Sequence, residues 1–205
     1  MAKLVTVIIP YLEDRGWLEQ AVRSVHEQTY PHIELIPIHG SKNRAGNIND
    51  GLKKAKGDFI KLLDEDDWLP KRAIELSVKK FNGDFIHGNA HTVKGKKITP
   101  YIPKIKYPTF ADVFKKNFVH GPTMMYAAGV YDKIGLYDED IGTAEDWDFN
   151  LRALAAGLNL GYIDEFLVYY RRHDTQVSTG KGADKNRRAI DNQKVRDKWI
   201  SLNNP

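Results

Sequence analysis

Four consecutive acidic residues, Asp-Glu-Asp-Asp at 64–67, follow an apolar run that ends at Leu63. Adjacent carboxylates repel one another and retain their hydration, so packing does not explain the cluster. Mg²⁺ or Mn²⁺ would relieve the repulsion, because carboxylate oxygens are ligands that these hard cations prefer. Asp64 and Asp66 project to the same side of an extended chain, which suits one shared ion. The alternative interpretation is a solvated loop that binds no metal.

A second acidic pair, Glu145 and Asp146, stands before a stretch with helical apolar spacing. Acidic side chains are favoured at a helix N-terminus by the helix dipole, and this is a purely structural explanation. The chemical interpretation is that one of the two carboxylates acts as a general base at the mouth of a site. The sequence pattern by itself leaves both interpretations open.

A basic group, Arg171, Arg172 and His173, follows a late apolar stretch. Imidazole nitrogen binds Mn²⁺, and guanidinium groups bind diphosphates through charge-assisted hydrogen bonds. A basic turn on the surface is the alternative. His39, after the second apolar run, is likewise either a site residue or an ordinary loop histidine.

Strand and helix patterns alternate through the first part of the chain, which predicts βαβ units and an α/β fold. The predicted strands are 4–9, 33–38 and 59–63, and the predicted helices are 16–28, 46–57 and 70–81. Ligands of such sheets bind at the carboxyl ends of the strands, where the acids at 64–67 fall. Pro37 inside the second strand predicts an edge or irregular position.

The later elements are less regular, and we expect a mixture of strands and helices. They are a strand from 85, a hairpin at 92–99, a helix at 110–116 with Thr109 as its cap, a helix beginning near 147, a strand at 162–170 and a terminal helix at 184–202. The terminal helix is charged, with scattered apolar residues. We expect it to pack on the domain, and peripheral membrane contact is the weaker interpretation.

Composition limits the classes of function. The 205 residues carry a formal charge of +4, with a pI of about 9.0, and predict one domain. This mild charge suits a phosphorylated ligand, and no nucleic-acid-binding motif is present. With no cysteine, disulfides, thiol catalysis and zinc–thiolate sites are excluded. No signal-peptide pattern or membrane-spanning apolar run occurs, so we expect a cytoplasmic protein with at most peripheral membrane contact.

The order of these blocks resembles family-2 glycosyltransferases, from Val5 to about Ser178. The matching segments are Val-Ile-Ile-Pro at 7–10, Ser-Val-x-x-Gln-Thr-Tyr-Pro at 24–31, Asn-x-Gly-Leu-x-x-Ala-x-Gly at 49–57, Leu-Asp-x-Asp-Asp at 63–67 with a following proline, Glu-Asp at 145–146 and Tyr-Arg-x-His at 170–173. The chain departs from the family at three places. Tyr11-Leu12-Glu13 replaces Thr-Tyr-Asn, Ile38-His39-Gly40-Ser41 replaces Asp-Asp-Gly-Ser, and Ile48 replaces an arginine.

The resemblance implies a GT-A fold, with a mostly parallel central sheet flanked by helices. It also implies an inverting transfer of sugar from a nucleotide-diphospho-sugar to a glycan or a lipid-linked acceptor. The nucleotide-binding half would span about 1–100, the acceptor half about 101–180 and a C-terminal helix about 183–202. Because two of the departures fall where the family binds the base, they put the identity of the nucleotide in doubt.

The resemblance also assigns roles to residues. Asp146 is the expected catalytic base, and Asp64, Asp66 and His173 are the expected ligands of Mn²⁺ or Mg²⁺. The expected donor-binding residues are Pro10, Tyr11, Glu13, His39, Asn49, Asp64, Glu65 and Arg172.

Two other classes of protein remain as alternatives. A nucleotidyltransferase uses a similar sheet and metal, but residues 10–16 lack the glycine-rich basic loop that such enzymes usually carry. A non-catalytic sugar or nucleotide binder is suggested by the altered residues Leu12 and His39, and the intact acids argue against it.

Overall fold

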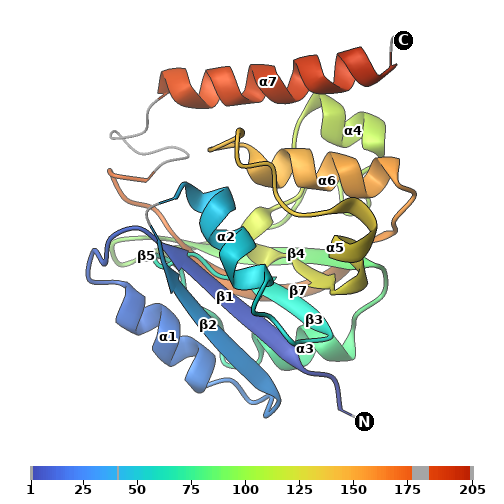
Figure 1. Cartoon of the computed structure of the whole chain (residues 1–205). Helices are drawn as coiled ribbons and strands as arrows, with labels where there is room; N and C mark the ends of the chain where they lie inside the picture. The colour runs from blue at the N-terminus through green and yellow to red at the C-terminus, as the bar shows by residue number, and fades with distance from the viewer. Residues whose placement is uncertain (1, 41, 177–184, 204–205) are drawn as a thin grey trace.

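The computed structural model describes residues 2–40, 42–176 and 185–203, so Ser41 of the altered motif lies outside the described residues. Seven strands form one sheet with helices on both of its faces (Figure 1). Helices α1 (Leu18–His26) and α3 (Ala73–Lys79) close an apolar core on one face. Helix α2 (Arg44–Leu52) and the later helices close a second core on the other face.

The first three strands are parallel, as the alternating pattern predicts. Strand β1 (Val5–Tyr11) lies between β2 (Ile33–His39) and β3 (Phe59–Leu62). Tyr11 is paired with His39, so β1 and β2 end side by side. Among the described strands, β2 pairs with β1 alone, which confirms the edge position predicted from Pro37.

The second half makes the sheet mixed rather than mostly parallel. Strand β6 (Met125–Ala127) inserts antiparallel between β3 and β4 (Phe85–Lys94). Strand β5 (Lys97–Tyr101) forms the predicted hairpin with β4, and β7 (Leu160–Arg171) runs parallel to β4. The three residues of β6 are too few to show a period, which is why the sequence did not predict this strand.

The second acidic pair begins one of the later helices. Thr109 caps α4 (Phe110–Lys115) as predicted. A 3₁₀ turn at Gly121–Thr123 leads into β6, and α5 (Gly129–Ile134) follows that strand. Helix α6 (Glu145–Ala155) is tied to α4, because the Trp147 indole donates to the Val113 carbonyl at 2.7 Å.

Helix α7 (Lys185–Asn203) packs outside α4 and α6 (Figure 1). Its Val195 and Trp199 side chains are buried, and the Trp199 ring meets Phe110 of α4 edge-on at 5.3 Å. The expected terminal packing helix is therefore confirmed. None of the helices in the described ranges combines the length and apolar character that crossing a bilayer requires.

Candidate active site

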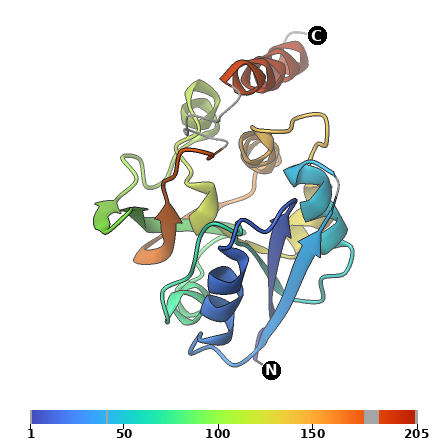
Figure 2. The ribbon, with the colours of Figure 1, turned by 90° about the vertical axis from the view of Figure 1, so that its left-hand side faces the viewer.

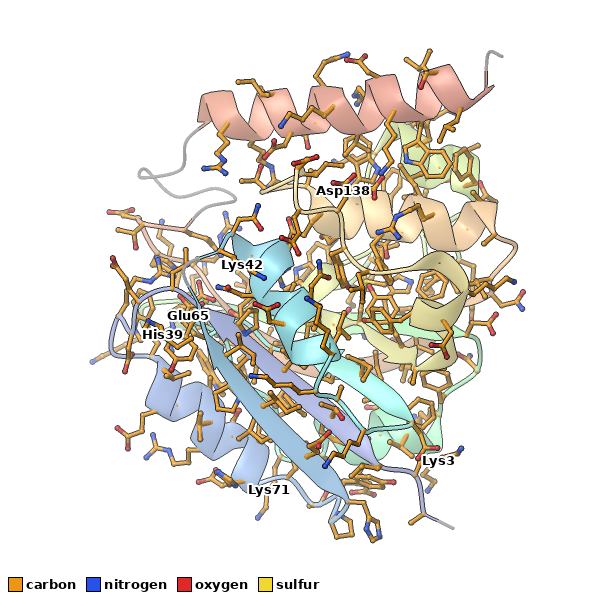
Figure 3. All side chains as sticks on the ribbon, in the orientation of Figure 1. Lys3, His39, Lys42, Glu65, Lys71 and Asp138 are labelled. Carbon is orange, nitrogen blue, oxygen red and sulfur yellow. The ribbon has the colours of Figure 1, made fainter. Side chains whose placement is uncertain are left out.

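The acidic loop directly follows β3 at the edge where the parallel strands end. Carboxylate oxygens of Asp64, Asp66 and Asp67 all lie within 4.8 Å of one another. Glu65 points to a different partner and forms an ion pair with Arg15, in the loop after β1. Figure 3 shows Glu65 and His39 at the same end of the sheet. The predicted acids therefore converge, and Asp67 joins them.

Asp67 is the least exposed acid of this loop, at 1%. Its Oδ1 accepts a hydrogen bond from the Arg171 backbone N–H at 2.8 Å, while Oδ2 is buried without a partner within the residues that the structure describes. Burial and the charges of Asp66 and Asp64 raise the pKa of Asp67 well above its usual range. Three convergent carboxylates and one orphaned oxygen fit a hard divalent cation.

His173 lies against this cluster, as the sequence predicts. Its Nε2 is 2.8 Å from Asp66 Oδ2, and its ring rests on Trp17 at 4.5 Å between centroids. Burial raises the pKa of Asp66, with the negative charge of Asp64 acting in the same direction, whereas His173 lowers it.

Arg171 contacts the acidic loop, whereas the predicted donor-binding residue Arg172 has no contact with that loop in the described part of the chain. The Arg171 Nε donates to the Asp66 carbonyl at 2.7 Å, and its guanidinium lies over the Trp17 and Trp68 rings. The Arg172 guanidinium instead lies over Tyr170, 5.7 Å from the ring centroid. Arg172 directly follows β7 and its backbone N–H still donates to the Val93 carbonyl of β4, so successive side chains of this extended chain point to opposite sides and only Arg171 reaches the loop.

Arg44, the first residue of α2, is a site residue that the sequence reasoning missed. Its Nε donates to Asp64 Oδ1 at 2.7 Å and its second guanidinium arm donates to Glu145 Oε1 at 2.5 Å. Arg44 thus joins the acidic loop to the N-terminus of α6. A signal was present, because Arg44 stands one helical turn before Ile48, and residues four apart share a helix face.

The two acids at the start of α6 have different surroundings. Glu145 is 4% exposed and paired with Arg44, and burial raises its pKa to about 7 although Arg44 acts in the opposite direction. Asp146 is partly exposed and accepts a hydrogen bond from the Asn117 amide at 3.4 Å. Burial raises the pKa of Asp146, while the charges of Arg44 and Arg188 lower it. Among the described residues Asp146 has no ion-pair partner, so it is the acid that is free to take a proton.

The segment before β6 presents backbone to Asp146 and is held by Lys61 of β3. A Cβ atom on Gly121 would lie 2.9 Å from Asp146 Oδ2, so only glycine leaves room for that carboxylate. The buried Lys61 ammonium donates to the Pro122 carbonyl and, at 3.1 Å, to the Met124 carbonyl. Burial lowers the pKa of Lys61 to about 7.

The strand ends of β1 and β2 place the predicted donor-binding residues Tyr11 and His39 together. Their rings stack with centroids 5.1 Å apart, and His39 Nε2 donates to the Leu12 carbonyl at 3.0 Å. Pro10 is buried within β1, and Glu13 is exposed in the loop that follows.

Asn49 occupies a different place from the one expected for a donor contact. Its side chain is 2% exposed and donates to the Tyr137 carbonyl at 2.9 Å and to Glu139 Oε1 at 3.0 Å. Its Oδ1 accepts from the Tyr137 backbone N–H at 2.9 Å. Because the amide is buried and satisfied on both sides, Asn49 fastens α2 to the segment after α5 instead of facing a ligand.

We expect Arg44→Met to destabilise the protein more at about pH 8 than at about pH 5, by about 1–3 kcal/mol at the higher pH. Without the guanidinium, the pKa of Glu145 rises further above 4.5, the ordinary value for this group. When a carboxyl group has a higher pKa in the folded than in the unfolded protein, the folded protein loses stability as the pH rises past the unfolded pKa. Urea unfolding at both pH values measures the difference.

The matched control for this prediction is the double variant Arg44→Met/Glu145→Gln. Glutamine cannot ionise, so the part of the pH dependence that comes from Glu145 should disappear in the double variant. Equal destabilisation of Arg44→Met at both pH values would show that Glu145 does not depend on Arg44.

Comparisons with known sequences identify relatives of this chain. A family model described as "Glycosyltransferase like family 2" matches residues 2–192. The uncharacterised glycosyltransferase YwdF of Bacillus subtilis is 35% identical over 136 residues, which cover 60% of this chain and 50% of YwdF. MJ1057 of Methanocaldococcus jannaschii, also named an uncharacterised glycosyltransferase, is 32% identical over 209 residues, which cover 82% of this chain and 70% of MJ1057. The chain thus spans 50 to 70% of the length of these two relatives.

Solved structures share the fold. Residues 1–349 of S. aureus TarS, in complex with UDP-GlcNAc, match with a TM-score of 0.65 and 16% identity, over 82% of this chain and 58% of that one. The mannosyltransferase PcManGT of Pyrobaculum calidifontis, in complex with GDP-Man and Mn²⁺, matches with a TM-score of 0.60 and 16% identity, over 80% and 56%. These similarities confirm the GT-A fold. Together with the match over residues 2–192, they show that the chain belongs to the glycosyltransferase-like family 2.

Proposed function

We propose that this protein is a metal-dependent, inverting glycosyltransferase that moves a sugar from a nucleotide-diphospho-sugar to a hydroxyl of a glycan or lipid-linked acceptor. The observation that carries the proposal is the convergence of Asp64, Asp66 and Asp67 at the strand ends, with Arg44 joining them to the acidic start of α6. The names of the relatives and the nucleotide-sugars bound to TarS and PcManGT support it.

The acidic loop is the proposed place of the donor diphosphate. Asp64, Asp66 and Asp67 would hold Mn²⁺ or Mg²⁺, and His173 lies close enough to Asp66 to complete the ligand set. The ion, when bound, stabilises negative charge on the leaving diphosphate. Arg171 adds a fixed positive charge beside the loop, because its guanidinium is held between two indole rings.

Asp146 is the proposed general base. It takes the proton from the acceptor hydroxyl while the hydroxyl oxygen attacks the anomeric carbon, and the bond from that carbon to the diphosphate oxygen breaks. Attack from the face opposite the leaving group inverts the configuration. The raised pKa of Asp146 suits this role, since a carboxylate with an ordinary pKa is a weak base near neutrality.

The nucleotide base is proposed to lie beside the stacked Tyr11 and His39 rings. His39 cannot accept hydrogen bonds as a carboxylate does, and its Nε2–H is already donated to Leu12. Its Nδ1 is therefore an acceptor in the neutral ring. A neutral imidazole offers different hydrogen-bonding groups from the aspartate that the family usually has at this position. The nucleotide preference is therefore left to the binding experiment below.

A thermal-shift screen of nucleotide diphosphates and nucleotide-sugars, each with and without Mn²⁺, tests the proposal. A ligand that binds the native state raises the melting temperature by mass action, so one nucleotide should give a shift that requires the metal. Product analysis with that donor should then show a transferred sugar and a released nucleoside diphosphate. Release of pyrophosphate would identify a nucleotidyltransferase, and binding without turnover across a wide acceptor panel would identify a non-catalytic binder.

A further inference from the structure

The β4–β5 hairpin and the segment after it form a basic stretch without acids. From Phe85 to Ala111 there is no aspartate or glutamate. The same stretch contains five lysines, Lys94, Lys96, Lys97, Lys104 and Lys106. All five are exposed. We call the surface formed by these lysines and the apolar residues at 98–107 the hairpin edge.

Exposed apolar side chains fall in the same stretch of the chain. Among the described residues, nine large apolar side chains are exposed, and four of them fall within the hairpin edge. These are Ile98 at 55%, Tyr101 at 38%, Ile102 at 53% and Tyr107 at 61%. Single exposed apolar residues are ordinary, but four within ten positions, interleaved in sequence with lysines around a free sheet edge, indicate a partner.

The positive charge of the hairpin edge is largely uncompensated. Lys106 pairs with Asp164 at 3.6 Å, whereas no ion pair joins a carboxylate to the other four lysines in the part of the chain that is described. Strand β5 pairs only with β4 among the described strands, so it forms a free edge of the sheet. Figure 2 shows the hairpin at the left margin of the molecule, away from α1, α2 and α7.

We propose that the hairpin edge docks on the surface of an anionic lipid bilayer. Lysines attract anionic headgroups, and interleaved isoleucine and tyrosine side chains bury apolar area at the level of the headgroups. Nucleic acid would match the charge but would leave Ile98 and Ile102 without apolar partners. On helix α7 the exposed Ile190 and Ile200 lie ten positions apart with the exposed acid Asp197 between them, so its apolar side chains are less concentrated than those of the hairpin edge.

The hairpin edge is also connected by side-chain and backbone contacts to Asp146, the candidate base. The Tyr101 ring contacts His120 at 4.7 Å between centroids, and the neighbouring Gly121 packs against Asp146. A docked enzyme would therefore present Asp146 to an acceptor carried by the membrane. This consequence rests on the proposed function and favours a lipid-linked acceptor over a soluble glycan, whereas docking itself does not depend on it.

Co-sedimentation with vesicles of phosphatidylcholine, with and without phosphatidylglycerol, tests the docking in the absence of donor and metal. We expect binding that requires phosphatidylglycerol and weakens with salt. Replacing Lys94, Lys96, Lys97 and Lys104 by glutamine should weaken binding at least about tenfold. The double variant Ile98→Ser/Ile102→Ser should also weaken it, because apolar burial contributes.

The matched control replaces four exposed lysines elsewhere, Lys54, Lys56, Lys71 and Lys79, by glutamine and removes the same charge. It should bind vesicles as the wild type does. Equal loss in both lysine variants, equal binding to both kinds of vesicle, or binding only to an oligonucleotide would overturn the proposal. The donor-induced thermal shift, measured on the same variants, should stay unchanged, so a failure of docking is distinguished from a failure of the donor site.

Discussion

Replacing Asp146 by asparagine should lower the rate of sugar transfer by about 10²- to 10⁴-fold, the usual contribution of a general base. Asparagine has nearly the same shape, so the contacts with Asn117 and Gly121 should persist. It has no lone pair basic enough to take the proton of the acceptor hydroxyl. Transfer rates at saturating donor, together with the donor-induced thermal shift, separate lost chemistry from lost binding.

Two further variants make this test specific to one carboxylate. Asp132→Asn makes the same chemical change on the exposed surface of α5 and should leave transfer unchanged. Glu145→Gln removes the neighbouring acid, which is bound to Arg44 and is not expected to take the proton. Retained transfer in Asp146→Asn, or a greater loss in Glu145→Gln, would remove Asp146 from the proposed role.

The second large effect is expected from Asp67→Asn, which should stabilise the metal-free protein and weaken donor binding. Asp67 has a buried oxygen without a partner and two neighbouring carboxylates. Because its folded pKa is raised, the wild type loses stability as the pH rises above 3.8, the ordinary value of this group. The variant should gain about 1–3 kcal/mol near neutral pH, and the gain should vanish in acid.

The same substitution should reduce donor affinity in the presence of Mn²⁺ by about 10- to 100-fold, the range seen when the surroundings of a metal are altered. Calorimetric titration of the donor with and without Mn²⁺ measures this loss, and chelation should abolish the wild-type signal. Asp140→Asn, on the exposed loop before α6, is the control and should change neither property. Unchanged affinity in Asp67→Asn would exclude Asp67 from the metal site.

The sequence was sufficient to predict those structural features that depend on local residue patterns and on the rules of parallel sheets. The three parallel strands, the edge position of Pro37 and the hairpin around residues 94–96 follow from apolar runs and turn residues. The convergence of the acidic loop with His173 was implied by the resemblance to the family, and in the structure both segments follow strands of the same sheet.

Features that depend on distant partners were not predictable in the same way. Arg44 and Glu145 are 101 positions apart, and Asn49 reaches Tyr137 and Glu139 over 88 and 90 positions. The choice of Arg171 over Arg172 required the register of β7, since one residue of shift exchanges the two sides of a strand. A motif identifies such residues as notable, but only tertiary packing decides what they contact.

Three of the contacts described above also bear on how the chain folds. Asn49, Lys61 and Arg44 belong to the first half, and each binds an acceptor group that the second half supplies. A fragment ending near residue 100 would leave the Asn49 amide and the Lys61 ammonium without these partners, and would leave the Arg44 guanidinium with Asp64 alone. The two stretches that we expect to bind donor and acceptor are thus joined by polar contacts, and we expect them to unfold as one cooperative unit.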